Sequence, residues 1–442
     1  MAETSKGVVG RIYGNLGRLL GGKVAAGVLS LAYMAIAARA LGPADYGVLI
    51  LVHAYVMTVG GIVEFPGWQA IVRYGAQALS SGDRPRLTRL LAFAGLVEGA
   101  GGMLAVLVAF VAGPWIGPRL GWSPTAIAFA GPYSLAVLAS IRSMPAGYLQ
   151  LSGRFDLLGA HNVVAPAVRL AGSIVALIGG AGLTGFLVVW LAAALAEWFA
   201  MWALGAYAAW GRLSHRDLVG GLRSVPRENP GLWRFMLTTN ADVTISELSG
   251  RMAPLAVGWM LGPAAAGLYA IAQRATAVLS QPAQILGQAA YAELARLVAS
   301  GEGGLIRGAV SRTVGIGLLA AVPVCVLVGL FGGRLAVLIA GDRFARAGSV
   351  MLWLALARTL LLAGPPISAA LTALGRPGLS VSANLVSSVG LILLLPPLLD
   401  WQGLTGAGLH ALVQAVASVT LLTICVRCET EALPAAVARI QA

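Results

Sequence analysis

The sequence predicts an all-α integral membrane protein with about twelve transmembrane helices, arranged as two parallel six-helix repeats around a central cavity. Three observations carry this prediction. The 442 residues are 58% hydrophobic and only 11% charged, whereas a soluble domain is about 25% charged. Apolar runs long enough to cross the ~30 Å hydrocarbon core as helices recur along the whole chain. A Leu-Gly-Pro turn between two such runs occurs once in each half, at Leu41 and at Leu261.

The apolar runs define the expected spans, and the polar connections between them define the expected domains. The longest connections are 66–89 and 211–234, and the second lies near the middle of the chain. We therefore expect an N-terminal six-helix bundle at 1–210, a cytoplasmic linker at 211–234 and a C-terminal six-helix bundle at 235–442. The expected spans are 19–40, 46–65, 90–112, 124–144, 162–180, 185–210, 235–261, 264–287, 310–332, 347–371, 379–399 and 404–426.

The basic residues predict the orientation in the membrane. The chain has 30 Lys and Arg against 17 Asp and Glu, a net charge of +13. Most of the basic residues fall on the side of the N-terminus, and basic loops stay in the cytoplasm. Both termini are therefore expected inside and both Leu-Gly-Pro turns outside. Because the positive charges are spread over helix ends, membrane topology explains them better than nucleic-acid binding does.

Several short motifs recur in the same order in both halves, which indicates an internal duplication. Besides the Leu-Gly-Pro turn, Leu151-Ser152-Gly153-Arg154 corresponds to Ala373-Leu374-Gly375-Arg376, and Gly182-Leu183-Thr184-Gly185 to Gly403-Leu404-Thr405-Gly406. Six helices per half is an even number, so both halves have the same orientation. This is a parallel repeat, and such transporters carry their substrate site between the repeats near the membrane midplane.

The turns also carry a resemblance to a known family. A basic N-terminus, a first helix and the motif Arg39–Gly47 resemble the start of the polysaccharide-transporter branch of the multidrug/oligosaccharidyl-lipid/polysaccharide (MOP) exporter superfamily, the Wzx-type oligosaccharide flippases. The second half repeats the signature at Gly258–Pro263 and Gly267–Ala270. A polar seventh helix, here with Asp242 and Arg251, is also typical of the family.

This resemblance implies a MATE-like fold and a function. Members of the branch move polyprenyl-diphosphate-linked oligosaccharides, precursors of cell-surface polysaccharide or lipopolysaccharide, by alternating access. The implied location is the bacterial cytoplasmic membrane. The implied partners are the lipid-linked oligosaccharide, membrane lipids, H⁺ or Na⁺, and the glycosyltransferases and polymerase that act on the same glycan.

Charged residues within the spans are the candidate site residues, because a charge at mid-bilayer is costly unless it faces a cavity or a partner. A guanidinium group binds phosphate oxygens in a forked geometry, so mid-depth arginines suit a diphosphate. Ion pairing between helices, for example of Glu247 with Arg251 one helical turn apart, is the alternative. The candidates for the diphosphate and sugar cavity are Arg251, Arg274, Arg169, Arg358, Gln281 and Gln288.

Intramembrane acids are the candidates for ion coupling, since export against a gradient requires a group that binds H⁺ or Na⁺. A purely structural role as salt-bridge partners is the alternative for each. These acids are Asp242, Glu247, Glu197 and Glu98.

No catalytic, cofactor or metal motif is expected. The sequence has no Walker loop and no dinucleotide fingerprint, and the pair Cys425 and Cys428 lacks further ligands nearby. We therefore expect a transporter rather than an enzyme. The alternatives are a MATE-type cation-coupled drug antiporter, a major-facilitator transporter and a membrane-embedded glycosyltransferase. The loop 73–89 lacks the major-facilitator pattern, and the outer loops are too short to favour a glycosyltransferase.

Overall fold

The computed structural model describes most of the chain, and the regular elements among the described residues are all helical, with no strand. The chain folds into two compact units, unit 1 (Met1–Arg251) and unit 2 (Met252–Ala442). The backbone is described for residues 2–63, 67–211, 221–280, 287, 290, 291, 293, 294, 296, 297 and 305–441, and the side chains for the same residues except 2–16, 18–20, 241–243, 245–250, 278, 320, 377 and 432–441.

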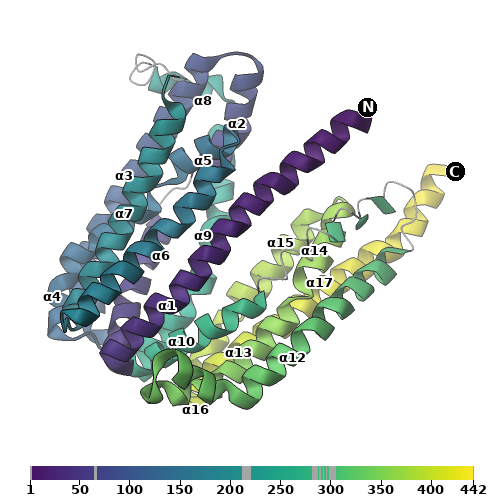
Figure 1. Cartoon of the computed structure of the whole chain (residues 1–442). Helices are drawn as coiled ribbons and strands as arrows, with labels where there is room; N and C mark the ends of the chain where they lie inside the picture. The colour runs from purple at the N-terminus through teal and green to yellow at the C-terminus, as the bar shows by residue number, and fades with distance from the viewer. Residues whose placement is uncertain are drawn as a thin grey trace. The chain divides into compact units, whose positions relative to one another are not determined.

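The helices of unit 1 follow the expected order (Figure 1). They are α1 (Ala2–Val63), α2 (Trp68–Ser80), α3 (Arg84–Ile116), η1 (Pro118–Leu120), α4 (Pro124–Tyr133), η2 (Ser134–Ser140), α5 (Ser143–Leu151), α6 (Phe155–Ile178), α7 (Leu183–Ala209), η4 (Leu222–Ser224), α8 (Val225–Glu228) and the first part of α9 (Leu232–Leu261). The helices of unit 2 are the rest of α9, α10 (Pro263–Thr276), η5 (Ala277–Ser280), α12 (Ile306–Ala340), η7 (Asp342–Ala347), α13 (Gly348–Leu361), α14 (Gly364–Ala373), α15 (Pro377–Leu385), the π-helical η8 (Val386–Gly390), η9 (Ile392–Leu394), α16 (Leu395–Gln402) and α17 (Leu404–Gln441).

Nine helical segments among the described residues are long and apolar enough to cross a membrane. The first of them contains two of the expected spans, because it breaks at Gly42. Helix α9 coincides with the expected seventh span, and α10 with the first part of the expected eighth span, 264–287. The predicted all-α membrane fold is therefore confirmed. The nine segments are Gly21–Val63, Arg84–Ile116, Pro124–Leu151, Phe155–Ile178, Leu183–Ala209, Ile306–Ala340, Asp342–Ala373, Gly378–Gln402 and Leu404–Glu431.

The two Leu-Gly-Pro turns have the same backbone conformation. Gly42 has φ 73° and ψ 176°, and Gly262 has φ 85° and ψ 173°. Only glycine adopts this region readily, since a Cβ atom clashes there. The proline that follows begins the next helix, where its missing N–H has no partner to lose. The sequence thus sets the same helix–turn–helix connection twice.

A second pair of turns also matches between the units. Gly153 has φ 72° and Gly375 has φ 75°. The N–H of Arg154 donates to the Leu149 carbonyl oxygen, and the N–H of Arg376 donates to the Leu371 carbonyl oxygen, both at 2.8 Å. Each turn closes its helix in the Schellman manner. These matched geometries support two repeats of one fold, while the boundaries 1–210, 211–234 and 235–442 stay predictions.

Unit 1 is organised around α1, which packs along α6, while α6 packs along α7. The α1–α6 contact is close because Gly22 lies against the backbone of Gly159, where a Cβ atom would be 2.1 Å from the carbonyl oxygen. The largest fully buried side chains among the described residues include Trp190, Tyr46 and Tyr133, all in this unit. This packing places the interior faces of α1, α4, α6 and α7 together.

The connection 66–89, expected to be polar, contains helix α2. One face of α2 is buried through Ala70, Ile71, Tyr74 and Ala78, and the helix packs on α3 and α5. The apolar residues recur at helical spacing within an otherwise polar stretch, as in an amphipathic helix. The segment therefore forms part of unit 1 rather than an extended loop.

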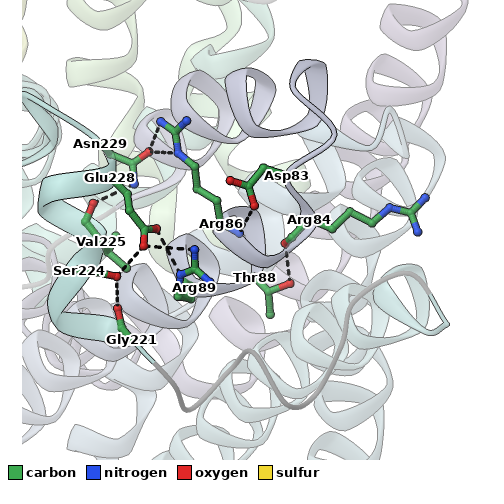
Figure 2. Close-up of polar contacts among 10 residues, drawn as sticks. All are labelled: Asp83, Arg84, Arg86, Thr88, Arg89, Gly221, Ser224, Val225, Glu228 and Asn229. Atoms are coloured by element: carbon green, nitrogen blue, oxygen red, sulfur yellow. Dashed lines mark hydrogen bonds and ion pairs between the residues drawn. The ribbon is translucent and has the colours of Figure 1, made fainter.

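The end of the polar segment 211–234 is attached to α3 by side-chain contacts that we call the clamp (Figure 2). Arg86 donates from Nε and Nη2 to the Asn229 side-chain oxygen, at 3.1 and 2.9 Å. Arg89 forms an ion pair with Glu228 at 3.1 Å, and the Ser224 hydroxyl donates to the same carboxylate at 2.6 Å. The described part of the expected linker therefore packs on unit 1.

Unit 2 is built from α12, α13 and α17, which pack in that order, with α14 and α15 also lying on α17. Its core includes Ile306, Ile367, Leu371 and Leu422. The helix after α15 is irregular, because η8 is a π-helical turn and the His410 ring nitrogen Nε2 lies 2.9 Å from the Leu391 carbonyl oxygen there. A side chain that bonds a freed carbonyl commonly accompanies such a helix irregularity.

Candidate functional site

Arg169 of α6 is a cationic group with several side-chain partners inside unit 1. Its Nη1 donates to the Tyr33 hydroxyl and its Nη2 to His53 Nε2, each at 3.2 Å. The guanidinium carbon also lies 5.4 Å from the centre of the Trp190 ring, within the range of a cation–π contact. Its Nε is buried and has no hydrogen-bond partner among the described residues. One buried donor of this half-buried cation is therefore uncommitted among the described residues.

His53 connects Arg169 to Tyr133. The second ring nitrogen, Nδ1, lies 2.9 Å from the Tyr133 hydroxyl. A guanidinium group can only donate, so Nε2 of His53 must accept and the proton of the neutral ring must reside on Nδ1. Nδ1 therefore donates to Tyr133. We call Arg169, Tyr33, His53, Tyr133 and Trp190 the Arg169 cluster.

Arg251 lies next to this cluster. Its Nη1 donates to the Met57 carbonyl oxygen of α1 at 2.5 Å, one helical turn after His53. The charges of both Arg251 and Arg169 act on the His53 imidazole. The structure thus brings two of the four predicted arginines to the same part of α1.

The other two predicted arginines lie in unit 2. Arg358 of α13 donates from Nη1 to the Ser280 hydroxyl at 2.7 Å and from Nη2 to the Gln273 carbonyl oxygen at 3.4 Å. Arg274 of α10 is half-buried, and its charge acts on Arg358. The Nε of Arg358 is buried and lacks a hydrogen-bond partner among the described residues. Unit 2 therefore has its own pair of interacting cations.

Two of the predicted ion-coupling acids have committed partners. Glu98 of α3 is fully buried and accepts from the backbone N–H groups of Ser143 and Met144, at 2.5 and 2.8 Å. It thereby caps the N-terminus of α5, which favours a negative group. Glu197 of α7 forms an ion pair with Arg142. Glu197 thus has a salt-bridge partner, the alternative considered for it, whereas Glu98 has a different structural role as a helix cap. Ion coupling through these acids stays a prediction.

The remaining predicted residues, Asp242, Glu247, Gln281 and Gln288, lie outside the residues whose side chains the structure describes. The aromatic partners Tyr33, Tyr133 and Trp190 were not predicted as site residues, because aromatic residues within apolar runs usually belong to the core. The signal that could have found them is the Arg within a span, which needs polar or π partners nearby. In the described part of the chain, no three His, Cys, Asp or Glu side chains group as metal ligands would.

Comparison of the sequence with known families gives one match that covers most of the chain. Residues 13–295 match the family described as polysaccharide biosynthesis protein. The chain is also similar to the inner membrane protein YghQ of Escherichia coli strain K12, with 28% identity over 312 residues, 69% of this chain and 86% of that protein.

Solved structures with similar folds come from transporters. An inward-facing multidrug resistance MATE family transporter of the MOP superfamily superposes with a TM-score of 0.69 at 14% identity, over 94% of this chain and 95% of that one. The lipid II flippase MurJ, in an inward closed conformation, gives 0.69 at 12% identity over 93% and 88%. The Vibrio cholerae MATE transporter VcmN, in its bent form, gives 0.57 at 15% identity over 98% and 99%. These likenesses confirm the predicted MATE-like fold.

Proposed function

The chain belongs to the polysaccharide biosynthesis protein family, and we propose that it flips a polyprenyl-diphosphate-linked oligosaccharide across the cytoplasmic membrane by alternating access. The observation that carries the proposal is the Arg169 cluster. It holds a half-buried cation whose hydrogen-bonded and stacked neighbours are neutral hydroxyl, imidazole and aromatic groups. A cation held in this way is suited to an anionic ligand.

The chemistry of a diphosphate fits the uncommitted donor of Arg169. A guanidinium group presents parallel N–H donors that match two phosphate oxygens. Arg169 uses Nη1 and Nη2 for neutral acceptors, while its Nε has none among the described residues. A phosphate oxygen is a stronger acceptor than a neutral hydroxyl or imidazole, so the ligand can replace these contacts. Arg251, Arg274 and Arg358 are the further cations proposed to receive the anionic headgroup and sugar, together with Gln281 and Gln288.

The positive charge of the arginines also favours a flippase over the main alternative function, a cation-coupled drug antiporter. The fold does not distinguish the two, because a MATE transporter and the MurJ flippase superpose with the same TM-score of 0.69. A cationic drug would be repelled by Arg169 and Arg251, whose charges act on the same imidazole. An anionic headgroup is attracted to both.

The proposal includes the setting of the protein. The cytoplasmic membrane of a bacterium is proposed from the family resemblance, and the placement of both termini inside from the distribution of basic residues. Coupling to H⁺ or Na⁺ and cooperation with glycosyltransferases and a polymerase follow from the proposed substrate.

Deletion of the gene tests the proposed function. We expect sugar-loaded polyprenyl carrier to accumulate on the inner leaflet and surface glycan to be lost, with both restored by the wild-type gene on a plasmid. Lipid extraction followed by mass spectrometry, with a membrane-impermeant lectin to report sidedness, measures the carrier. Normal surface glycan with no stranded carrier in the deletion strain contradicts the proposal.

A further inference from the structure

The Arg169 cluster contains a titratable group that is not among the predicted site residues, His53. Its Nε2 faces the guanidinium group of Arg169 at 3.2 Å, so the ring is neutral and carries its proton on Nδ1. If Nε2 also carried a proton, two N–H donors, one of His53 and one of Arg169, would face each other. Two positive charges would then lie within one hydrogen-bond length. Protonation of His53 therefore requires Arg169 to move away.

The other groups around His53 also oppose a positive charge on it. Arg251 of α9 adds a second positive charge, and Tyr133 of α4 and Tyr33 of α1 are neutral phenols. Among the described residues, the intramembrane acids of α3 and α7, both of which pack on α1, have partners of their own. Glu98 of α3 caps α5, and Glu197 of α7 pairs with Arg142. Asp242 and Glu247 of α9 lie outside the residues whose side chains the structure describes. Since none of the described acids is hydrogen-bonded to His53, we take an anionic ligand as the group that balances an imidazolium at this place.

We infer that His53 is a proton-binding site linked to the anionic ligand of Arg169, so that binding of a diphosphate is accompanied by uptake of one proton at His53 Nε2. This inference rests on the proposed function. The diphosphate draws Arg169 away from Nε2, which uncovers the lone pair of the nitrogen. Its negative charge then stabilises the imidazolium ion, and the proton comes from bulk water. Because linkage is reciprocal, a proton on His53 also releases Arg169 for the ligand.

An orphaned hydroxyl supports a ligand beside Arg169. Ser173 lies one helical turn after Arg169 on α6 and is completely buried. Its hydroxyl, like Arg169 Nε, has no hydrogen-bond partner among the described residues. Buried polar groups are almost always bonded, and an exception calls for an unplaced water, ion or ligand. Both groups can donate to an anion.

The test measures binding of a short diphosphate diester, farnesyl-diphosphoryl-N-acetylglucosamine, to the purified full-length protein in detergent. A diphosphate esterified at both ends has no proton that titrates near neutral pH, unlike a terminal phosphate with its pKa of ~6. Binding is measured by calorimetry from about pH 5.5 to about pH 8.5, around the ordinary imidazole pKa of ~6.5. One linked proton gives an affinity that tightens by up to about tenfold for each pH unit downwards.

His53→Gln is the decisive variant, because its amide can accept from Arg169 and donate to Tyr133 but cannot titrate. We expect it to bind the probe with an affinity independent of pH. His410→Gln is the matched control, since His410 lies in unit 2 against the Leu391 carbonyl oxygen, and it should keep the wild-type slope. A flat wild-type profile, or equal slopes in wild type and His53→Gln, overturns this inference and leaves the proposed function standing. A wild-type protein that binds no probe at any pH contradicts both.

A second measurement needs no variant. The chain has 4 histidines, and ¹⁵N-imidazole NMR reports the protonation of each. We expect His53 to be neutral with its proton on Nδ1 in the free protein and to become an imidazolium ion when the probe is added near neutral pH. An imidazolium at His53 in the free protein, or a neutral ring in both states, overturns the inference.

Discussion

The first turn of α5 in unit 1 and the first turn of α14 in unit 2 differ in how they treat the backbone N–H groups that have no acceptor within the helix. When Arg154 is aligned with Arg376, Ser143 and Met144 correspond to Pro365 and Pro366. In unit 1 the two free N–H groups are accepted by the buried carboxylate of Glu98. In unit 2 prolines occupy these positions, and a proline has no N–H to satisfy. Unit 1 supplies a buried carboxylate as the acceptor, whereas unit 2 has no N–H groups at these positions that require an acceptor.

The groups around the intramembrane arginines also differ between the two units. Position 53 of unit 1 corresponds to position 273 of unit 2 when the Leu-Gly-Pro turns are aligned. His53 receives a hydrogen bond from Arg169 through its titratable ring, whereas Gln273 receives one from Arg358 through its backbone carbonyl oxygen. The Arg169 cation of unit 1 therefore has a titratable partner, whereas the described partners of Arg358 in unit 2 are a hydroxyl and a backbone carbonyl oxygen, which do not titrate. This difference indicates that duplication preserved the backbone turns while the polar interiors became specialised.

The largest expected effect comes from removing the buried carboxylate. Glu98→Leu leaves two backbone N–H groups of α5 without acceptors, and each costs roughly 1–3 kcal/mol. We expect the free energy of unfolding in detergent to fall by about 2–5 kcal/mol, measured by denaturant titration.

Introducing the prolines of unit 2 at the corresponding positions of unit 1 tests this prediction further. Adding Ser143→Pro and Met144→Pro to Glu98→Leu should recover most of the loss, because the orphaned donors no longer exist. The same two prolines in the Glu98 background complete a double-mutant cycle and isolate the coupling. Equal effects of the prolines in both backgrounds would refute the comparison.

Replacing Arg169 tests whether the Arg169 cluster of unit 1 binds the ligand. Arg169→Ala should reduce export of the lipid-linked glycan about 10- to 100-fold, because a hydrogen bond to a charged group contributes ~1.5–3 kcal/mol. Surface glycan in the complemented deletion strain measures this, with the amount of folded protein checked by fluorescence size exclusion. The control is Arg154→Ala at the start of the same helix, where Arg154 pairs with Asp156. Wild-type export in Arg169→Ala would exclude the Arg169 cluster as the ligand site.

Substitutions in the two Leu-Gly-Pro turns test a feature that the units share, the backbone conformation of the turn glycine. Gly42→Ala and Gly262→Ala should each lower the free energy of unfolding by about 1–3 kcal/mol, because both glycines occupy a backbone region that excludes a Cβ atom. Gly99→Ala is the control, since a methyl group there meets open space within α3. A loss at only one of the two turns would show that the units do not share this constraint.

The smallest expected effect concerns the clamp of unit 1. Glu228→Gln removes the ion pair with Arg89, whose partners are 22% and 26% exposed. Because such pairs are partly screened by water, we expect a loss below about 1 kcal/mol in thermal unfolding. Glu293→Gln in unit 2 removes a pair exposed at 73% and 54% and should change nothing measurable. A larger loss at Glu293 than at Glu228 would contradict this ranking.

The membrane fold could be predicted from the sequence because its causes are local. The length and apolarity of each run fix a helix that spans the membrane, and Gly42 and Gly262 fix the same turn through the conformation of a single residue. Helix α2 was missed as an element, because a short amphipathic helix carries a weaker signal than a long apolar run. Arg169, Arg251, Arg274 and Arg358 could be selected by charge alone, since a charge within a span is rare.

By itself, the sequence determined the helices, the repeated turns and the presence of cations at membrane depth. Only the tertiary structure decided which groups those cations meet. His53 and Arg169, or Glu98 and Ser143, are far apart in the chain and come together through the packing of α1 on α6 and of α3 on α5. Hydropathy and local conformation act within one helix, whereas a hydrogen bond between helices depends on the rotation of both. That rotation is set by contacts such as Gly22 against Gly159, which no single segment encodes.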